Sequence, residues 1–247
     1  MSALELTVII PVYNEEAILA ESVGGLLRGF AAFGLDAYEI VLAENGSRDR
    51  TREIAAELSR MHPQVRTFSC AAPNYGAALR EGIEGARGEF VLCEEIDLCD
   101  LEFHRRALAL LRAGEVDLVV GSKAMRGAHD RRPLARRAAT RLYNGLLRVA
   151  LGFTGTDTHG LKAFRRAALV PVVARCIVGH DVFASELVIR AEREGLRVRE
   201  IPVELAEKRP PSVHLLRRVP RVLHQLLRLM AAIHLGVGAQ RPGDESR

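Results

Sequence analysis

The sequence predicts an α/β fold with a mostly parallel central sheet and helices on both of its faces. Short apolar runs rich in β-branched residues alternate along the chain with longer amphipathic stretches. This alternation is typical of strands joined by crossover helices, which cover both faces of a parallel sheet. The length of 247 residues is enough for one large domain with a substantial core.

The first half of the chain shows the alternation most clearly. The expected strands are Leu6–Val12, Tyr38–Ala43, Val65–Cys70, Glu89–Cys93 and Asp117–Gly121. The expected helices are Glu15–Phe30, Asp49–Arg60, Tyr75–Ala86 and Leu101–Arg112. Ligands of such sheets bind beyond the carboxyl ends of the strands, so the residues that follow each strand are candidates for a site.

The pattern is less regular after residue 122. An arginine-rich stretch leads into Pro133 and a basic helical segment that reaches about Gly152, followed by a turn rich in Gly and Thr at 154–160. A strand at Leu161–Phe164, a helix around Val182–Glu194 and an edge strand at Val198–Leu205 are expected next. We divide the chain into a first half, 1–121, a second half, 122–212, and a C-terminal segment, 213–247.

Charge is distributed unevenly. Residues 1–100 carry 17 Asp or Glu and 8 Lys or Arg, whereas residues 121–150 carry 8 Lys or Arg and one Asp. Residues 208–241 contain 7 basic side chains and no carboxylate. The basic half is therefore expected to face an anionic partner, such as phosphates, nucleic acid or an anionic membrane surface.

The cysteines and the N-terminus indicate a cytoplasmic protein. Cys70, Cys93, Cys99 and Cys176 show no metal-ligand spacing, and we expect buried, reduced thiols. The N-terminus lacks the basic and apolar regions of a signal peptide, and no window approaches the ~20 apolar residues of a membrane-spanning helix.

The first strand runs into Pro11, Tyr13 and Glu15. Pro11 is expected to end the strand pairing, Tyr13 can offer a ring face to a nucleobase, and Glu15 can accept hydrogen bonds at the start of the next helix. Taken alone, an ordinary strand end followed by a helix start would explain this motif equally well.

The second strand ends in a similar way. Gly46 permits a tight turn, Ser47 or Asp49 can cap the next helix, and Glu44 is expected to point into the same crevice as Glu15. Two strand ends thus supply carboxylates to one site.

The fourth strand ends in an acidic run, Glu94–Asp97. If the backbone stays extended, Glu95 and Asp97 lie on one face, where they can hold Mg²⁺ or Mn²⁺ on a nucleotide diphosphate. A solvated acidic loop is the alternative.

In this order and spacing the motifs resemble family 2 glycosyltransferases, which have the Rossmann-like GT-A fold. Further motifs extend the similarity to the polyprenyl-phosphate mannose and glucose synthases, including the dolichyl-phosphate enzymes. They are Asn74–Leu79, Gly88–Val91, Gly121–Lys123, Pro133–Arg137, Thr156–Phe164 and Glu186–Ala191. The resemblance covers about residues 4–212.

The resemblance implies an inverting hexosyltransferase that uses a GDP- or UDP-sugar, a divalent metal and a polyprenyl phosphate acceptor. It implies nucleotide contacts from Pro11, Tyr13, Glu15 and Glu44 and the Gly46–Ser47 turn, and metal binding by Glu95 and Asp97. Lys123 and one or both of Arg136 and Arg137 are expected to meet the acceptor phosphate. Asp157, His159, Arg209 and Ser212 are expected near the acceptor or the sugar.

Two motifs depart from the family pattern. Glu44 and Glu95 each stand where the family usually has Asp, which keeps the carboxylate but moves it further from the backbone. A non-catalytic nucleotide-binding member is therefore one alternative. A transferase acting on a soluble hydroxyl is another. A phosphate acceptor is already ionised and needs no general base, so we expect His159 to position the substrate.

The C-terminal segment places apolar residues at helical spacing over Val213–Leu235, with four arginines nearby. A basic amphipathic helix of this kind can lie in a membrane interface, and we expect a peripheral protein on the cytoplasmic face. Packing on the domain is the alternative. Nucleic-acid binding is disfavoured, because only 5% of residues are aromatic and none is Trp.

Overall fold

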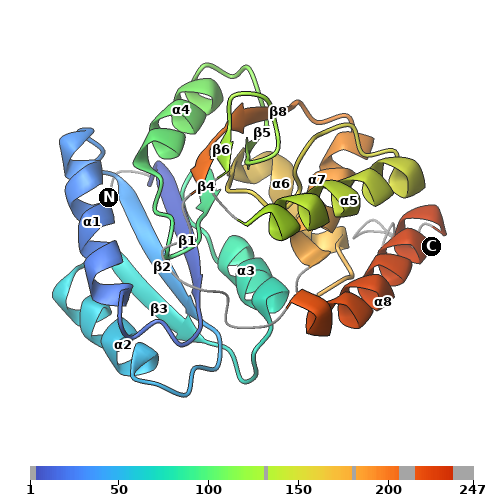
Figure 1. Cartoon of the computed structure of the whole chain (residues 1–247). Coiled ribbons are helices and arrows are strands. Elements are labelled where there is room, and N and C mark those ends of the chain that lie inside the picture. Colours follow the sequence, from blue (N-terminus) through green and yellow to red (C-terminus); the bar gives the residue numbers. More distant parts are fainter. Residues whose placement is uncertain (1–3, 131–132, 180–181, 206–214, 236–247) are drawn as a thin grey trace, which may run out of the picture.

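The computed structural model describes residues 4–130, 133–179, 182–205 and 215–235. Arg209 and Ser212, two of the predicted acceptor residues, lie outside the described residues. The strands of a seven-stranded sheet are β1 (Leu6–Val12), β2 (Tyr38–Glu44), β3 (Val65–Ser69), β4 (Phe90–Cys93), β5 (Leu118–Ser122), β7 (Lys162–Arg165) and β8 (Val198–Pro202). The helices are α1 (Leu19–Ala32), α2 (Thr51–Met61), α3 (Tyr75–Glu84), α4 (Leu101–Arg112), α5 (Leu134–Leu151), α6 (Arg166–Arg175), α7 (Phe183–Arg193) and α8 (Leu215–His234) (Figure 1).

The sheet has the strand order β3-β2-β1-β4-β7-β5-β8. Its strand pairs are parallel except for those of β7, which runs antiparallel to both β4 and β5. The expected mostly parallel sheet is thus confirmed. After β3 the chain returns to the other side of β1, and a reversal of this kind opens a crevice beyond the carboxyl ends of the strands.

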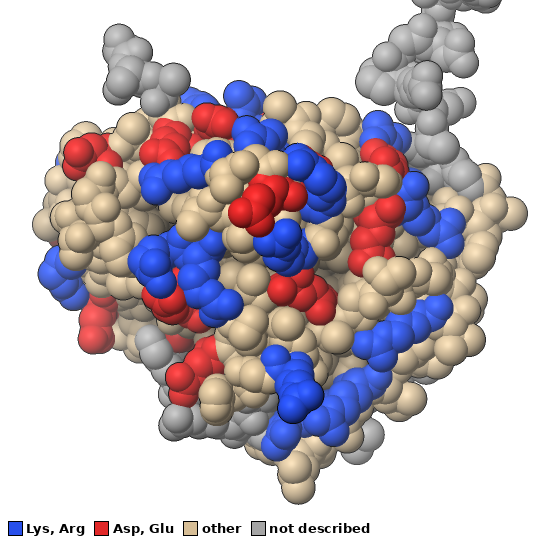
Figure 2. Space-filling view, turned by 90° about the horizontal axis from the view of Figure 1, so that it is seen from above, with Lys and Arg blue, Asp and Glu red and all other residues tan. Residues whose placement is uncertain are grey.

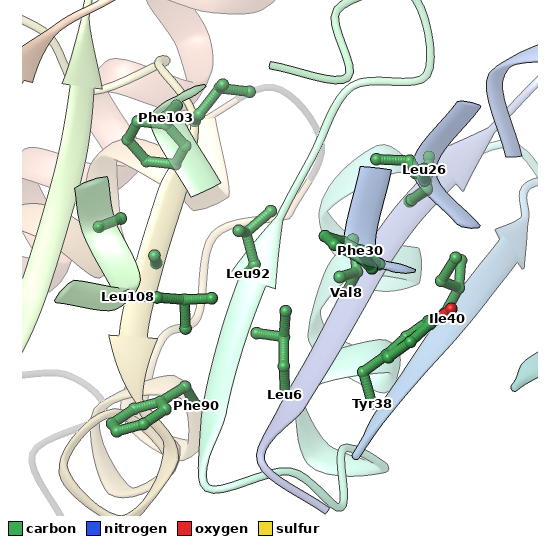
Figure 3. Close-up of a cluster of buried hydrophobic side chains, with 14 of the residues drawn as sticks. Leu6, Val8, Leu26, Phe30, Tyr38, Ile40, Phe90, Leu92, Phe103 and Leu108 are labelled. Carbon is green, nitrogen blue, oxygen red and sulfur yellow. The ribbon is translucent and has the colours of Figure 1, made fainter. Parts of the chain in front are cut away.

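Both faces of the sheet are buried. Val8 and Ile10 of β1 pack in one cluster with α1, α2 and α4, whereas the intervening Ile9 packs in a second cluster with α3, α6 and α7. In Figure 3, Leu26 and Phe30 of α1 point toward the sheet residues of the first cluster. Burial on both faces explains why these strands read as continuous apolar runs in the sequence.

Several element boundaries differ from the expected ones. Helix α1 begins at Leu19, because the residues after Glu15 first form a turn in which the Glu15 carbonyl accepts from the N–H groups of Ile18 and Leu19. Pro11 does not end the strand pairing: it lies opposite Ala43, and the pairing continues to Val12.

The second half contains elements that the sequence did not predict. Helix α6 carries Pro171 in its interior, and a short parallel pair is formed by β6 (His129–Asp130) and β9 (Glu204–Leu205). The expected single strand at 198–205 is therefore divided between β8 and β9. The division falls at Val203, whose N–H donates to the Ser122 carbonyl at 3.2 Å.

The described part of α8 packs on the domain. Leu226 and Leu229 are buried in the second cluster, and Met230 and Ile233 pack against it. The expectation that Leu226, Met230 and Ile233 face a membrane is therefore wrong, and packing on the domain accounts for them.

The cysteines are only partly as expected. Cys93 and Cys176 are buried, but Cys70 and Cys99 are partly exposed, and all four are free thiols. Cys70 directly follows the edge strand β3, and Cys99 has a φ of 46° in the turn that precedes α4, so neither lies within an apolar core strand.

A buried carboxylate joins β1 and β2 at the end of the sheet opposite the crevice. Glu39 is 2% exposed and accepts hydrogen bonds from Thr7 Oγ1 at 2.7 Å, Arg66 Nε at 2.8 Å and the Arg87 N–H at 3.0 Å. Burial tends to raise the pKa of Glu39, but these hydrogen bonds, together with that from Arg87 Nε at 2.8 Å, outweigh it and lower the pKa from 4.5 to about 2.

Replacing Glu39 by Gln should therefore remove a pH-dependent part of the stability. Because the folded-state pKa lies below the unfolded value, the contribution is complete above pH 4.5 and is lost as the pH falls toward 2. Urea unfolding followed by circular dichroism should show Glu39→Gln less stable than the wild type by about 3 kcal/mol at pH 7, with a smaller difference at pH 3. A difference independent of pH would contradict this account.

Candidate active site

The loops that follow β1 and β2 are joined by hydrogen bonds. The N–H of Asn14 donates to Ser47 Oγ at 3.1 Å, and that of Glu15 donates to Thr51 Oγ1 at 2.7 Å. The N–H of Arg48 donates to Asn14 Oδ1 at 2.9 Å. Asn14 has a φ of 55°, a conformation that Asn adopts more readily than most residues. The two strand-end motifs thus form one continuous wall of the crevice.

Glu44 is buried within this wall. Its carboxylate accepts from the Ser47 N–H at 2.5 Å and from Arg52 Nε at 3.0 Å. Burial tends to raise the pKa of Glu44, but hydrogen bonds, above all from Ser47, outweigh it and the pKa is lowered. Gly46 supplies the φ of +75° that the turn requires. Glu44 therefore shapes its own turn, which corrects the expectation that it points into the crevice.

The other predicted nucleotide residues lie along the same wall. Tyr13 is 41% exposed, so its ring is accessible for stacking, whereas Pro11 and Glu15 are partly buried. The wall continues to α3, since the N–H of Asn74 donates to Asn45 Oδ1 at 2.7 Å.

The acidic run after β4 forms a turn, which we call the acidic turn (Glu94–Leu98). The N–H of Leu98 donates to the Glu95 carbonyl at 2.9 Å, and Ile96 is buried in the core. The expected extended backbone is thus wrong. Glu95 and Asp97 nevertheless interact: burial raises the pKa of Glu95 most, the charge of Lys123 lowers it, and the charge of Asp97 raises it.

The donor set of the acidic turn suits a divalent cation. Within the described ranges, no group of three or more His, Cys, Asp or Glu side chains could hold a metal ion. Two carboxylates fit a cation that completes its coordination with phosphate oxygens and water, as Mg²⁺ commonly does. A cation would also offset the repulsion between Glu95 and Asp97.

Lys123 brings the second half of the chain to the acidic turn. It follows β5, and its Nζ lies 3.5 Å from Oδ2 of the buried Asp157. Burial tends to raise the pKa of Asp157, but Lys123 and His159 outweigh it and the pKa is lowered. Because Lys123 also acts on Glu95, Lys123 and Asp157 lie in the same region as the predicted metal residue Glu95.

His159 is held in place from several sides. Its backbone N–H donates to Asp157 Oδ1 at 2.9 Å, and its ring Nδ1 lies 3.3 Å from Thr158 Oγ1. The ring of Tyr143, from α5, contacts it edge to face with centroids 5.1 Å apart. This arrangement fits a positioning role.

Lys162 is a site residue that the sequence analysis did not identify. It is 3% exposed at the start of β7, and its Nζ donates to the Gly160 carbonyl at 2.8 Å. Burial lowers its pKa to about 8, while the charges of Asp157 and Glu95 favour the protonated form. A lysine inside an otherwise apolar strand was the signal that could have revealed it.

Glu200, on β8, is a second residue near the site that the sequence did not reveal. Its carboxylate accepts from the N–H groups of Thr156 at 2.6 Å and Asp157 at 3.0 Å. The Thr156 hydroxyl lies 2.6 Å from Oγ of the buried Ser122. These contacts fix the turn that carries Asp157 beside β5.

A basic hollow adjoins Lys123. A cavity of about 70 Å³ is lined by Lys123, Ala124, Met125, Ala128, Arg137, Thr140 and Arg141. A neighbouring cavity of about 270 Å³ is lined by Ala124, Arg141, Asn144, Arg148 and Thr156. We call the two cavities together the basic hollow. Arg137, but not Arg136, lines it. Figure 2 shows that Lys and Arg side chains also form a row along one edge of the face seen from above.

The chain is similar in sequence to known glycosyltransferases. Glycosyltransferase AglD of Haloferax volcanii is 32% identical over 231 residues, 92% of this chain and 37% of that protein. Dolichyl-phosphate beta-glucosyltransferase ALG5A of Trichomonas vaginalis is 27% identical over 83% of this chain and 67% of that protein. Undecaprenyl-phosphate 4-deoxy-4-formamido-L-arabinose transferase of Edwardsiella ictaluri is 29% identical over 82% of this chain and 60% of that protein. The chain thus spans between 37% and 67% of the length of these relatives.

A solved structure shares the fold. Glucosyl-3-phosphoglycerate synthase from Mycobacterium tuberculosis, determined with Mn²⁺, UDP and phosphoglyceric acid, matches with a TM-score of 0.65 at 22% identity. The match covers 92% of this chain and 78% of that one. The pattern of glycosyl transferase family 2 matches residues 7–171, which is more than half of the chain. The resemblance inferred from the motifs is therefore confirmed, and the chain belongs to glycosyl transferase family 2.

Proposed function

We propose that the chain transfers a hexose, with inversion, from a GDP- or UDP-sugar to a polyprenyl phosphate. The observation that carries this proposal is that one residue, Lys123, interacts with Glu95 of the acidic turn and with Asp157 and also lines the basic hollow. Residues 1–121 would hold the donor and residues 122–212 the acceptor. The names of two relatives, a dolichyl-phosphate and an undecaprenyl-phosphate sugar transferase, support this acceptor class.

The reaction is an in-line displacement. A phosphate oxygen of the acceptor attacks the anomeric carbon, and the bond from that carbon to the diphosphate breaks, with its electron pair leaving on the nucleoside diphosphate. Lys123 and Arg137 bind the acceptor phosphate, and Asp157 holds Lys123 in place. Glu95 and Asp97 would hold Mg²⁺ or Mn²⁺, which neutralises charge on a departing diphosphate. Inversion follows because one displacement occurs.

Replacing Asp97 by Ala should abolish most of the turnover. With a panel of GDP- and UDP-sugars, Mg²⁺ or Mn²⁺ and a polyprenyl phosphate, the wild type should release nucleotide, and Asp97→Ala should be slower by roughly 100-fold or more. Asp36→Ala, at an exposed position after α1, is the matched control and should retain activity. If nucleotide binds but no acceptor, lipid or soluble, causes its release, the chain is a binding module instead.

Arg136 and Arg137 should differ in their effect on the acceptor. Loss of a charge-assisted phosphate contact at Arg137→Ala should raise the KM for the polyprenyl phosphate about 10-fold or more. Arg136→Ala, one position along α5 and outside the lining of the basic hollow, should change this KM less. Equal effects of the two variants on KM would contradict the assignment of the hollow.

We place the membrane contact on α5. Leu142, Leu146 and Val149 follow helical spacing and are 68%, 42% and 91% exposed, and Leu134 on the same helix is 76% exposed. An exposed apolar stripe beside arginines suits the interface of an anionic bilayer, in which a polyprenyl phosphate would be embedded. Among the described helices, none combines the length and hydropathy needed to cross a membrane.

A double substitution, Leu142→Asp with Val149→Asp, tests this surface. In flotation with vesicles that contain an anionic lipid, the wild type should bind and the variant should lose most of this binding. The reason is that two apolar side chains that would insert into the bilayer become charged. Activity on a short, water-soluble polyprenyl phosphate should be unchanged. Met61→Asp, on α2 and 63% exposed, serves as the control for an added surface charge. Unchanged flotation of the double variant would exclude α5 as the membrane contact.

A further inference from the structure

Glu94, the first residue of the acidic turn, forms a buried pair with His104 that takes no part in the proposed chemistry. Glu94 and His104 are 1% and 0% exposed. Glu94 directly follows β4, and its N–H donates to the Ile9 carbonyl of β1 at 2.9 Å. His104 lies in the first turns of α4, and its Nε2 makes a hydrogen-bond contact with Glu94 Oε2. The pair therefore connects the end of a central strand to the helix that follows the acidic turn.

The other oxygen of Glu94 holds the acidic turn itself. Glu94 Oε1 accepts from the N–H of Glu95 at 2.9 Å. The far end of the turn leads into Asp100, which caps α4 by accepting from the Phe103 N–H at 2.9 Å. The backbone between Glu95 and Asp100 is thus fixed at both ends to the same helix.

Stability of the core does not explain this pair. His104 is packed by the rings of Phe30 and Phe103, with centroids 5.7 and 6.4 Å away, and its Nδ1 has no hydrogen-bond partner among the described residues. Burying such groups costs free energy, and a well-packed apolar pair of similar volume is often as stable or more so. An apolar pair would not accept the hydrogen bond that the Glu95 N–H donates to Glu94.

We propose that Glu94 and His104 are positioning residues that fix the acidic turn so that Glu95 and Asp97 bind a divalent cation together with a nucleoside diphosphate. The inference rests on the proposed function. Groups that orient metal ligands through hydrogen bonds typically change metal affinity 10- to 100-fold when they are replaced. Neither residue contacts the reactants, so the effect should appear in metal-dependent binding.

Calorimetric titration with GDP and UDP, each with and without Mn²⁺, gives a readout that does not depend on turnover. In Glu94→Met the Kd measured with Mn²⁺ should rise about 10-fold, whereas the Kd without metal should stay as in the wild type. Glu94→Gln should stay close to the wild type with Mn²⁺, because its amide oxygen can accept from the Glu95 N–H and its NH₂ can donate to His104.

Kinetics separate positioning from a general loss of structure. In Glu94→Met the Mn²⁺ concentration for half-maximal activity should rise, and kcat should return toward the wild-type value at saturating Mn²⁺. A merely structural defect would lower kcat and leave the Mn²⁺ requirement unchanged. Glu39→Met is the matched control. Glu39 is also buried and also accepts from a backbone N–H, but it lies near the start of β2, at the end of the sheet away from the acidic turn.

His104→Phe provides a second test if Glu94→Met does not fold. Phenylalanine keeps an aromatic ring beside Phe30 and Phe103 but removes the contact with Glu94, so the Kd with Mn²⁺ should rise again. A wild-type Kd with Mn²⁺ in the folded variants would overturn the positioning role and leave the proposed function intact. If Mn²⁺ does not strengthen nucleotide binding even in the wild type, the metal assignment of the proposed function fails, and this inference fails with it.

Discussion

The ion pair between Lys123 and Asp157 is the interaction on which the site depends. Lys123 follows β5, and Asp157 lies in the turn before β7, so the pair joins two segments that are distant in sequence. Asp157 is fully buried, and removing Lys123 would take away the cation that most lowers its pKa and that also acts on Glu95. The same pair fixes the basic side chain that faces the acidic turn. This contact therefore contributes both to the stability of the region and to the proposed binding of an anionic acceptor.

The antiparallel direction of β7 explains how the turn that carries Asp157 and His159 reaches the site. β7 lies between β4 and β5, and its first residue, Lys162, is opposite Cys93 at the end of β4. If β7 were parallel to β4, the residues after β7 would lie at the crevice edge of the sheet. Because β7 is antiparallel, the residues before it lie there instead. Gly160 makes the approach possible, because a Cβ there would lie 1.7 Å from the Gly121 carbonyl oxygen. Only a residue without a side chain fits at this position beside Gly121.

The sequence was sufficient for the parallel part of the fold and for most of the residues around the crevice. Continuous apolar runs and amphipathic crossover helices identify β1 to β5 and α1 to α4, because burial of the strands on both faces leaves a strong pattern. Helix α6 was missed because Pro171 interrupts it, and β6 and β9 were missed because two residues are too few to show a period. Glu200 acts through contacts with a segment distant in sequence, and the pair Glu94–His104 joins a strand end to the following helix; neither contact leaves a pattern in the sequence.

The two departures from the family pattern have different physical consequences. At position 44 the longer side chain reaches the N–H of Ser47 and also Arg52, so Glu is accounted for by the turn that it closes. At position 95 the backbone leaves the strand and turns, with Ile96 directed into the core. The separation of the Glu95 and Asp97 carboxylates is therefore set by the turn and not by strand alternation. Because the turn fixes the backbone, the additional side-chain torsion of Glu can adjust the position of its carboxylate. A Glu at position 95 is therefore compatible with a cation shared with Asp97.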